Sequence, residues 1–153
     1  MDLATQRQKY RGLQLTAQRL AILDYLEGNE EHPTAKDIYK KVSKKFPTMS
    51  FATVYKTLET LVEKGYLVEL NIEADKRRFD PNTEPHHHLI CTQCKKIVDL
   101  QRTFNLAIPD SEREGFEIVD NRIEFFGLCP KCRTKKSKFR NKFDTIRPTW
   151  GGR

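Results

Sequence analysis

The sequence predicts an α+β chain in which helices come first and strands follow. Up to Gly65, apolar side chains recur at helical spacing. After Gly65, the pattern changes to short runs of β-prone residues separated by turn residues. The four cysteines all lie in this strand-rich part, as two Cys-x-x-Cys pairs. We therefore expect a helical module followed by a small β-domain whose thin apolar core needs help from a bound metal or a partner chain.

Three helices are predicted in the first part of the chain, over residues 16–28, 34–47 and 50–65. Each begins at a threonine or serine, residue types that cap helix N-termini, and ends at a glycine or a proline. The second helix also has an aspartate at its third position, where a capping box places an acidic side chain.

The second and third helices, joined by a short turn, match a helix-turn-helix. The third helix has an apolar face made of Phe51, Val54, Leu58, Leu61 and Val62. Its other face carries small and hydrogen-bonding side chains that suit a DNA major groove, namely Ala52, Thr53, Lys56 and Thr60, with Tyr55 at the flank. The pattern alone favours a solvated helix face equally well.

Residues 66–80 predict a β-hairpin, with YLVELNI and KRRFD as its strands around a turn at residues 73–75. Helices followed by such a hairpin make a winged helix. The basic residues of the wing, Lys76, Arg77 and Arg78, are placed to contact phosphates. The wing therefore favours DNA binding over a solvated face.

The two prolines of PNTEP (81–85) predict a domain boundary. We expect a winged-helix DNA-binding domain over 1–82, a metal-binding domain over 83–132 and a basic tail over 133–153. Strands are predicted at HHHLIC, KKIVDL, FEIVD and RIEFFGLC, with a short helix after Pro109.

The tail is basic and polar, which favours a loose segment, although Phe139, Phe143, Ile146 and Trp150 also have the spacing of a helix face running to Pro148. The tail carries the net charge of +7, because residues 131–153 hold nine basic side chains and one acidic one, whereas residues 1–130 hold 19 and 20. Overall charge therefore does not identify a DNA-binding protein.

The chain has no apolar run near the roughly 18 residues that a membrane span needs, and its first residues lack the apolar region of a secretory signal. We therefore expect a cytoplasmic protein without membrane contact. In a reducing compartment, paired Cys-x-x-Cys motifs favour metal over disulfides.

Cys91, Cys94, Cys129 and Cys132 form two pairs whose spacing suits tetrahedral thiolate binding of Zn²⁺. Two disulfides or idle thiols are the weaker alternative, because the two pairs use every cysteine of the chain. Structural zinc contributes about 10–16 kcal/mol to the folding of small modules. Such a site would stabilise the thin β-domain.

The run His86-His87-His88 requires a second site, because four thiolates already fill the zinc coordination sphere. In an extended strand the first and third side chains share a side, so His86 and His88 should converge while His87 points away. A solvated polar strand is the alternative. The available partners for a metal site are His32, Asp80 and Asp99.

The combination EHPTAKDIY, MSFATVYKTLETL, RRFD, HHHLICTQCKKIVDL and FFGLCPKC closely resembles the ferric-uptake-regulator (Fur) family over roughly residues 10–132. The resemblance implies a metal-dependent repressor: a homodimer with a winged helix and an α/β dimerisation domain that binds a pseudo-palindromic DNA operator. It also implies structural Zn²⁺ on the four cysteines and regulatory Fe²⁺ or Mn²⁺ on His32, Asp80, His86, His88 and Asp99. We expect DNA contacts from Arg19, Ser50, Ala52, Thr53, Tyr55, Lys56 and Arg77.

With an aspartate at position 99, the chain resembles the peroxide-sensing (PerR) subgroup of the family, since iron sensors usually have glutamate at this position. This resemblance implies that peroxide oxidises a ligand histidine, His32 or His86, on the Fe²⁺ form. An iron- or zinc-uptake regulator of the same family is the alternative. A zinc metalloenzyme is disfavoured, because the chain has no His-Glu-x-x-His and no His-x-Glu ahead of a Cys-x-x-Cys. We therefore expect no enzymatic activity.

Overall fold

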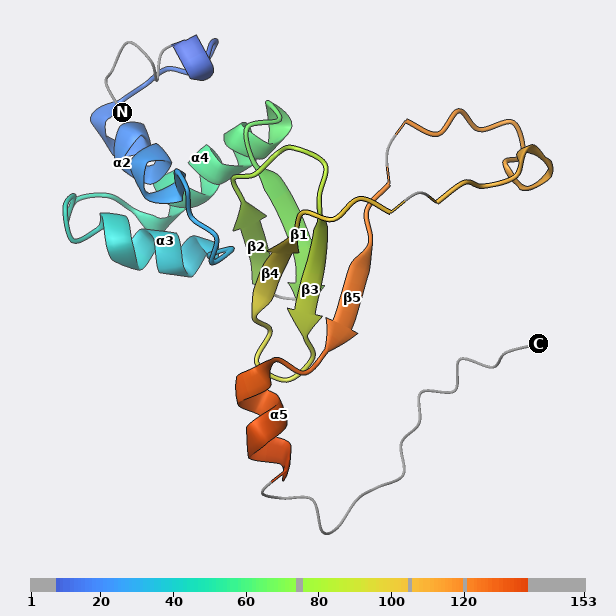
Figure 1. Cartoon of the computed structure of the whole chain (residues 1–153). Helices are drawn as coiled ribbons and strands as arrows, with labels where there is room; N and C mark the ends of the chain where they lie inside the picture. The colour runs from blue at the N-terminus through green and yellow to red at the C-terminus, as the bar shows by residue number, and fades with distance from the viewer. Residues whose placement is uncertain (1–7, 74–75, 105, 120, 138–153) are drawn as a thin grey trace.

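The structure, a computed structural model, describes residues 8–73, 76–104, 106–119 and 121–137. Figure 1 shows the helices gathered on one side of two small sheets, with the last helix at the far end of the second sheet. The elements in chain order are α2 (Ala17–Leu26), α3 (Ala35–Val42), α4 (Phe51–Glu63), β1 (Val68–Glu73), β2 (Lys76–Asp80), β3 (His87–Cys91), β4 (Ile97–Leu100), the 3-10 helix η1 (Asp110–Glu112), β5 (Glu124–Gly127) and α5 (Pro130–Ser137).

The predicted helix starts are confirmed by their caps. The hydroxyls of Thr16 and Ser50 accept hydrogen bonds from backbone amides in the first turns of α2 and α4, at 3.2 and 3.1 Å. Thr34 and Asp37 form a reciprocal capping box at the start of α3. The prediction that this helix reaches residue 47 is wrong. The helix ends at Val42, whose carbonyl then accepts the amides of Lys45 and Phe46 in a turn.

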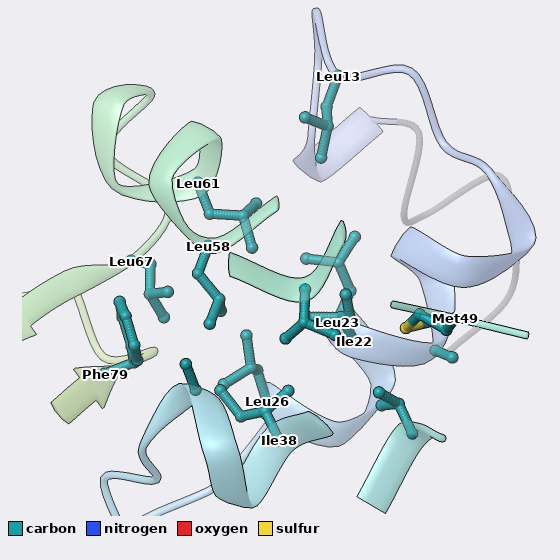
Figure 2. Close-up of a cluster of buried hydrophobic side chains, with 14 of the residues drawn as sticks. Leu13, Ile22, Leu23, Leu26, Ile38, Met49, Leu58, Leu61, Leu67 and Phe79 are labelled. Atoms are coloured by element: carbon teal, nitrogen blue, oxygen red, sulfur yellow. The ribbon is translucent and has the colours of Figure 1, made fainter. Parts of the chain in front are cut away.

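The main apolar core lies between the three helices and the hairpin (Figure 2). Ile22, Ile38 and Leu58 are completely buried there, and Phe79 of β2 closes the core on the hairpin side. Phe51 was expected on the buried face of α4 but is 45% exposed, with its ring against Tyr39. The first turn of α4 therefore extends beyond the core.

The two sheets confirm the hairpin and most of the later strands. β1 and β2 pair antiparallel, and the second sheet has the order β4-β3-β5. In it, β3 pairs antiparallel with β4 and parallel with β5. The strand predicted at FEIVD is wrong, because residues 116–119 form no strand and lie in the loop that extends away from the sheet (Figure 1). The short helix expected after Pro109 is confirmed as η1.

A second, smaller core joins the hairpin to the second sheet. Leu70 of β1 packs with Ile90 of β3 and Ile97 of β4, and Val68 and Ile72 lie against them. The residues of PNTEP thus separate the two modules along the chain but not in space. The domain boundaries at residues 82 and 132 stay predictions.

The last described helix includes residues that were assigned to the basic tail. A loose segment was expected from residue 133, but α5 begins at Pro130 and continues to Ser137. Residues 138–153, including the predicted apolar stripe, lie outside the described residues. Among the described residues, no helix combines the length and the apolar character that a membrane crossing needs.

Candidate metal centres

The four cysteines converge on one point. Cys91 is the last residue of β3 and Cys94 lies in the turn before β4, whereas Cys129 comes just before α5 and Cys132 lies in its first turn. Their sulfur atoms all lie within 4.8 Å of one another, and Cys94 Sγ is 3.7 Å from Cys129 Sγ. Four sulfurs held about 2.3 Å from a tetrahedral zinc ion stand about 3.8 Å apart. All four thiols are free, so the geometry fits structural Zn²⁺ rather than two disulfides.

The pKa values of the cysteine thiols also indicate a bound cation. Backbone amides, first that of Cys129 at 3.4 Å, lower the pKa of Cys91 to about 6. Burial, together with hydrogen bonds to the neighbouring thiols, raises the pKa of Cys132 to about 12. The metal-free cluster therefore forms one thiolate easily and resists forming another nearby. A bound dication reverses this, because a coordinating thiol loses its proton.

Three histidines and two aspartates form a second cluster, which we call the His/Asp cluster: His32, Asp80, His86, His88 and Asp99. His32 lies in the loop between α2 and α3, and Asp80 is the last residue of β2. The other three come from β3, the residue before it, and β4, where Asp99 stands opposite His88 in the sheet register. One ligand atom from each lies within 4.8 Å of all the others.

The distances within the His/Asp cluster match a coordination sphere. Asp80 Oδ2 is 2.9 Å from His86 Nε2, 3.2 Å from His88 Nε2 and 3.5 Å from His32 Nε2. Asp99 Oδ1 is 2.8 Å from His32 Nε2 and 3.7 and 3.8 Å from the other two nitrogens. Ligands held about 2.1 Å from one ion stand about 3 Å apart at right angles and about 4.2 Å apart when opposite. The six carboxylate–imidazole distances, from 2.8 to 3.8 Å, are close to this range.

Backbone carbonyls fix which histidine nitrogens face the cluster. His32 Nδ1 is 3.1 Å from the Glu30 carbonyl oxygen, and His86 Nδ1 is 2.7 Å from that of Glu84. A carbonyl only accepts, so both rings carry their proton on Nδ1, and when neutral they present a bare Nε2 inward. His32 Nε2 and Asp99 Oδ1 are buried without a hydrogen bond. Bare imidazole nitrogens and carboxylate oxygens are all hydrogen-bond acceptors. When such atoms face one another, a cation has to lie between them, and a metal ion fits this role.

The charges of the cluster lead to the same conclusion. Burial opposes ionisation of Asp80, but the nearby imidazoles of His32 and His88 and the hydrogen bond from the Asn82 amide hold its pKa well below the usual range. Burial lowers the pKa of His32, but its contact with Asp80 and the negative charges of Asp80 and Asp99 more than offset this and raise the pKa. Both shifts have the same cause, because the cluster favours a positive charge beside its carboxylates.

His87 lies outside the cluster. Its Nδ1 accepts a hydrogen bond from the Ile123 amide at 3.2 Å, and its ring lies 5.2 Å from that of Phe104. The alternation of a β-strand thus puts its two neighbours on the face of the sheet that carries the cluster and His87 on the opposite face. That all five cluster residues act as ligands stays a prediction.

The residues expected to contact DNA lie mainly at the start of α4 and on the wing. Ser50, Ala52 and Lys56 are exposed there. The guanidinium of Arg77 lies 5.7 Å over the ring of Tyr55, so the wing and α4 present one surface. Thr53 is half-buried, and the Arg19 guanidinium donates to the Gln14 carbonyl at 2.9 Å.

Arg78 was grouped with the wing residues that contact phosphates, but it turns the other way. Its guanidinium donates to the carbonyls of His32 at 3.2 Å and Lys95 at 3.4 Å. The alternation of β2 could have revealed this, because neighbouring residues of a strand point to opposite faces. The partners of Arg78 lie too far along the chain for a sequence pattern to identify them.

Comparisons with known proteins agree with this architecture. The family model described as "Ferric uptake regulator family" matches residues 10–126. The peroxide operon regulator of Bacillus subtilis is 42% identical over 134 residues, which span 84% of this chain and 90% of that protein. The peroxide stress regulator of Campylobacter jejuni is structurally similar, with a TM-score of 0.61 and 32% identity over 86% of this chain and all of that one. The ferric uptake regulator of Francisella tularensis, solved with iron, gives a TM-score of 0.65 and 25% identity over 81% of this chain and 97% of that one.

Proposed function

The chain belongs to the ferric uptake regulator family, and we propose that it is a metal-dependent, DNA-binding transcription repressor that responds to peroxide. The observation that carries this proposal is the buried His/Asp cluster, whose ligand atoms come from both modules of the chain. Its role is regulatory rather than catalytic. The four free thiols support a cytoplasmic location, where they stay reduced and available to zinc.

The donor set indicates which metals the cluster takes. Three imidazole nitrogens and two carboxylate oxygens suit Fe²⁺ or Mn²⁺, whereas the four sulfurs of the other site suit Zn²⁺. When bound, Fe²⁺ supplies one-electron chemistry toward peroxide that Mn²⁺ does not. The side chains that would hold the ion are buried except for Asp99, whose side chain is 17% exposed. Small molecules would therefore reach the cluster from the side of Asp99.

The His/Asp cluster couples metal binding to DNA binding, because it sets the angle between the two modules. His32 and Asp80 belong to the winged module, whereas His86, His88 and Asp99 belong to the β-domain. Bringing all five ligand atoms to one ion fixes the angle between the modules. Without a cation, the two carboxylates repel each other and favour looser arrangements. The difference in metal affinity between these arrangements supplies the coupling free energy.

A homodimer converts that angle into DNA affinity. β5 is an edge strand of the second sheet, with Phe125 39% and Phe126 62% exposed, and the adjoining loop exposes Phe116 and Val119. An unpaired edge beside an apolar surface supports pairing with a second copy of the chain. In a two-fold dimer, the module angle sets the distance between the two α4 helices, which must match the half-site spacing of a pseudo-palindromic operator.

The dimer is tested by light scattering coupled to size-exclusion chromatography. Phe126→Asp should convert a dimer into a monomer, because a carboxylate would be buried in the apolar interface. Phe51→Asp is the control, since it places the same charge on an exposed phenylalanine of α4, away from β5. A wild-type monomer, or a Phe126→Asp dimer of undiminished stability, would contradict this interface.

The repressor function is tested by selecting operators from a random DNA library with the Mn²⁺-loaded protein and measuring affinity by fluorescence anisotropy. The Mn²⁺ form should bind the selected DNA at least about tenfold more tightly than the form holding zinc alone, since coupling free energies are typically 1–3 kcal/mol. His86→Ala should abolish the metal effect. His87→Ala is the matched control, because it removes the adjacent ring, which does not face the cluster.

The peroxide response is tested on the same DNA. Peroxide should release the Fe²⁺ form of the protein from the DNA, whereas the Mn²⁺ form should stay bound to it. Mass spectrometry of the treated Fe²⁺ form should find one added oxygen on a peptide that contains His32 or His86. DNA binding by the Fe²⁺ form that survives peroxide would favour an iron- or zinc-uptake regulator of the same family.

A further inference from the structure

We propose that Arg78 is a positioning residue for the regulatory site, because it links the loop that carries His32 to the turn that carries the zinc-binding cysteines. This inference rests on the proposed metal function of the His/Asp cluster but adds a residue that does not belong to it. Arg78 contacts none of the five ligand atoms. It acts on His32 through the backbone.

The contacts of Arg78 span three parts of the chain that are distant in sequence. Its Nη1 donates to the carbonyl of His32, 46 residues away, at 3.2 Å, and its Nη2 donates to the carbonyl of Lys95, 17 residues away, at 3.4 Å. Lys95 closes the cysteine turn, since its amide donates to the Cys91 carbonyl at 2.9 Å. One planar guanidinium thus connects the α2–α3 loop, β2 and the zinc turn.

The backbone of β2 strengthens this connection. Thr34 pairs with Arg78 as an isolated antiparallel β-bridge, and the Phe79 amide donates to the Pro33 carbonyl at 3.0 Å. The segment that carries His32 is therefore docked along β2, with the Arg78 side chain over its end. Arg78 Nε is buried without a hydrogen-bond partner, so the two terminal nitrogens make the hydrogen bonds that hold the guanidinium.

Both carbonyls that Arg78 binds belong to residues in an unusual conformation. His32 has a φ of 48° and Lys95 a φ of 59°, in the left-handed region that non-glycine residues adopt at a cost. A strained backbone persists where its surroundings hold it in place. The His32 conformation directs its ring to Asp80 and Asp99, so a contact that maintains this conformation maintains the ligand geometry.

The sign of the effect separates positioning from simple electrostatics. Arg78 carries a positive charge close to a site for a divalent cation. If only charge mattered, removing it would reduce repulsion and tighten metal binding. If Arg78 positions His32, removing it weakens metal binding, because the site then has to be assembled when the ion arrives.

The experiment measures Mn²⁺ affinity by isothermal titration calorimetry on the full, zinc-saturated chain without DNA. The variants are Arg78→Gln, which removes the charge, and Arg78→Lys, which keeps the charge but has one ammonium in place of two separated donors. Arg113→Gln is the matched control, since Arg113 also donates to a carbonyl, at 2.8 Å, but within its own loop. Hydrogen exchange at the Phe79 amide, in the metal-free protein, reports whether the loop stays docked on β2.

Both Arg78 variants should lose at least about tenfold in Mn²⁺ affinity, as removal of residues that orient ligands typically does, and the Phe79 amide should exchange faster. Arg113→Gln should match the wild type. Unchanged or tighter Mn²⁺ binding by either Arg78 variant would overturn the proposal.

A Phe79 amide that keeps its protection in the variants would also overturn it. Loss of zinc along with Mn²⁺ would overturn it too, because that result would assign Arg78 to the folding of the cysteine turn. If Arg78→Gln does not fold, Arg78→Lys decides. A wild-type chain that binds no Mn²⁺ at the cluster would overturn the proposed function as well.

Discussion

Replacing Asp80 with asparagine removes one negative charge and one candidate ligand oxygen from the centre of the His/Asp cluster with almost no change in side-chain shape. The Asp80 side chain is 2% exposed, and its Oδ2 lies within 3.5 Å of all three histidine Nε2 atoms. Its Oδ1 accepts the Asn82 amide at 2.8 Å, a bond that the oxygen of asparagine can keep. An amide NH2 then takes the place of Oδ2, so the substitution removes both the charge and the ligand oxygen while the shape of the site stays the same.

The loss of a direct charged ligand should weaken Mn²⁺ binding at least about 100-fold, the upper end of what loss of an outer ligand contact costs. With free Mn²⁺ at about 100 times the wild-type Kd, binding stabilises the wild type by about 2.7 kcal/mol. At the same concentration the variant gains only about 0.4 kcal/mol. For a chain of this length these values correspond to increases in Tm of about 5–11 °C and about 1–2 °C.

The assay is thermal unfolding followed by circular dichroism, with and without Mn²⁺, on zinc-loaded protein. Asp110→Asn is the control, because Asp110 lies on η1 with its side chain 91% exposed and takes no part in the cluster. If Asp80→Asn keeps the full metal-induced increase in Tm while the control behaves like the wild type, Asp80 is not a ligand. The coupling of the two modules would then lack its central contact.

Three further predictions concern single residues. Asp99→Glu should keep Mn²⁺-dependent DNA binding but blunt the peroxide response of the Fe²⁺ form, because the longer side chain shifts an oxygen that now lies 2.8 Å from His32 Nε2; equal peroxide sensitivity in anisotropy would exclude this role. Lys95→Gly should raise the free energy of unfolding by about 0.5–1 kcal/mol in urea titrations, because glycine adopts the φ of 59° without strain; a less stable variant would mean that the Lys95 side chain matters more than the strain. Asp37→Asn should lower the free energy of unfolding by about 1 kcal/mol at pH 7, because the carboxylate caps α3. The Thr34 hydroxyl, above all, lowers the pKa of Asp37, so its contribution is complete above the unfolded pKa of about 3.9 and is lost as the pH falls through the lower folded pKa; a difference between variant and wild type that persists at the lowest pH would contradict this origin.

Much of the fold follows from local chemistry that a sequence displays directly. Thr16, Thr34 and Ser50 begin their helices because a hydroxyl close to free backbone amides stabilises a helix start wherever the helix later packs. His86 and His88 face the same way because side chains alternate along an extended strand. The cysteine pairs likewise predict a zinc site from spacing alone. Each of these features depends on residues a few positions apart.

Other features depend on which distant segment packs against which face, and only the tertiary structure decided them. Phe51 shares a helix face with buried residues, yet the core ends before it reaches that turn. Residues 116–119 have the composition of a strand, but β5 takes the place beside β3. Arg78 looks like its basic neighbours until the loop of His32 and the zinc turn provide carbonyls for it. Periodicity fixes which side chains share a face, whereas the contacts available to that face come from chain segments that no local pattern connects.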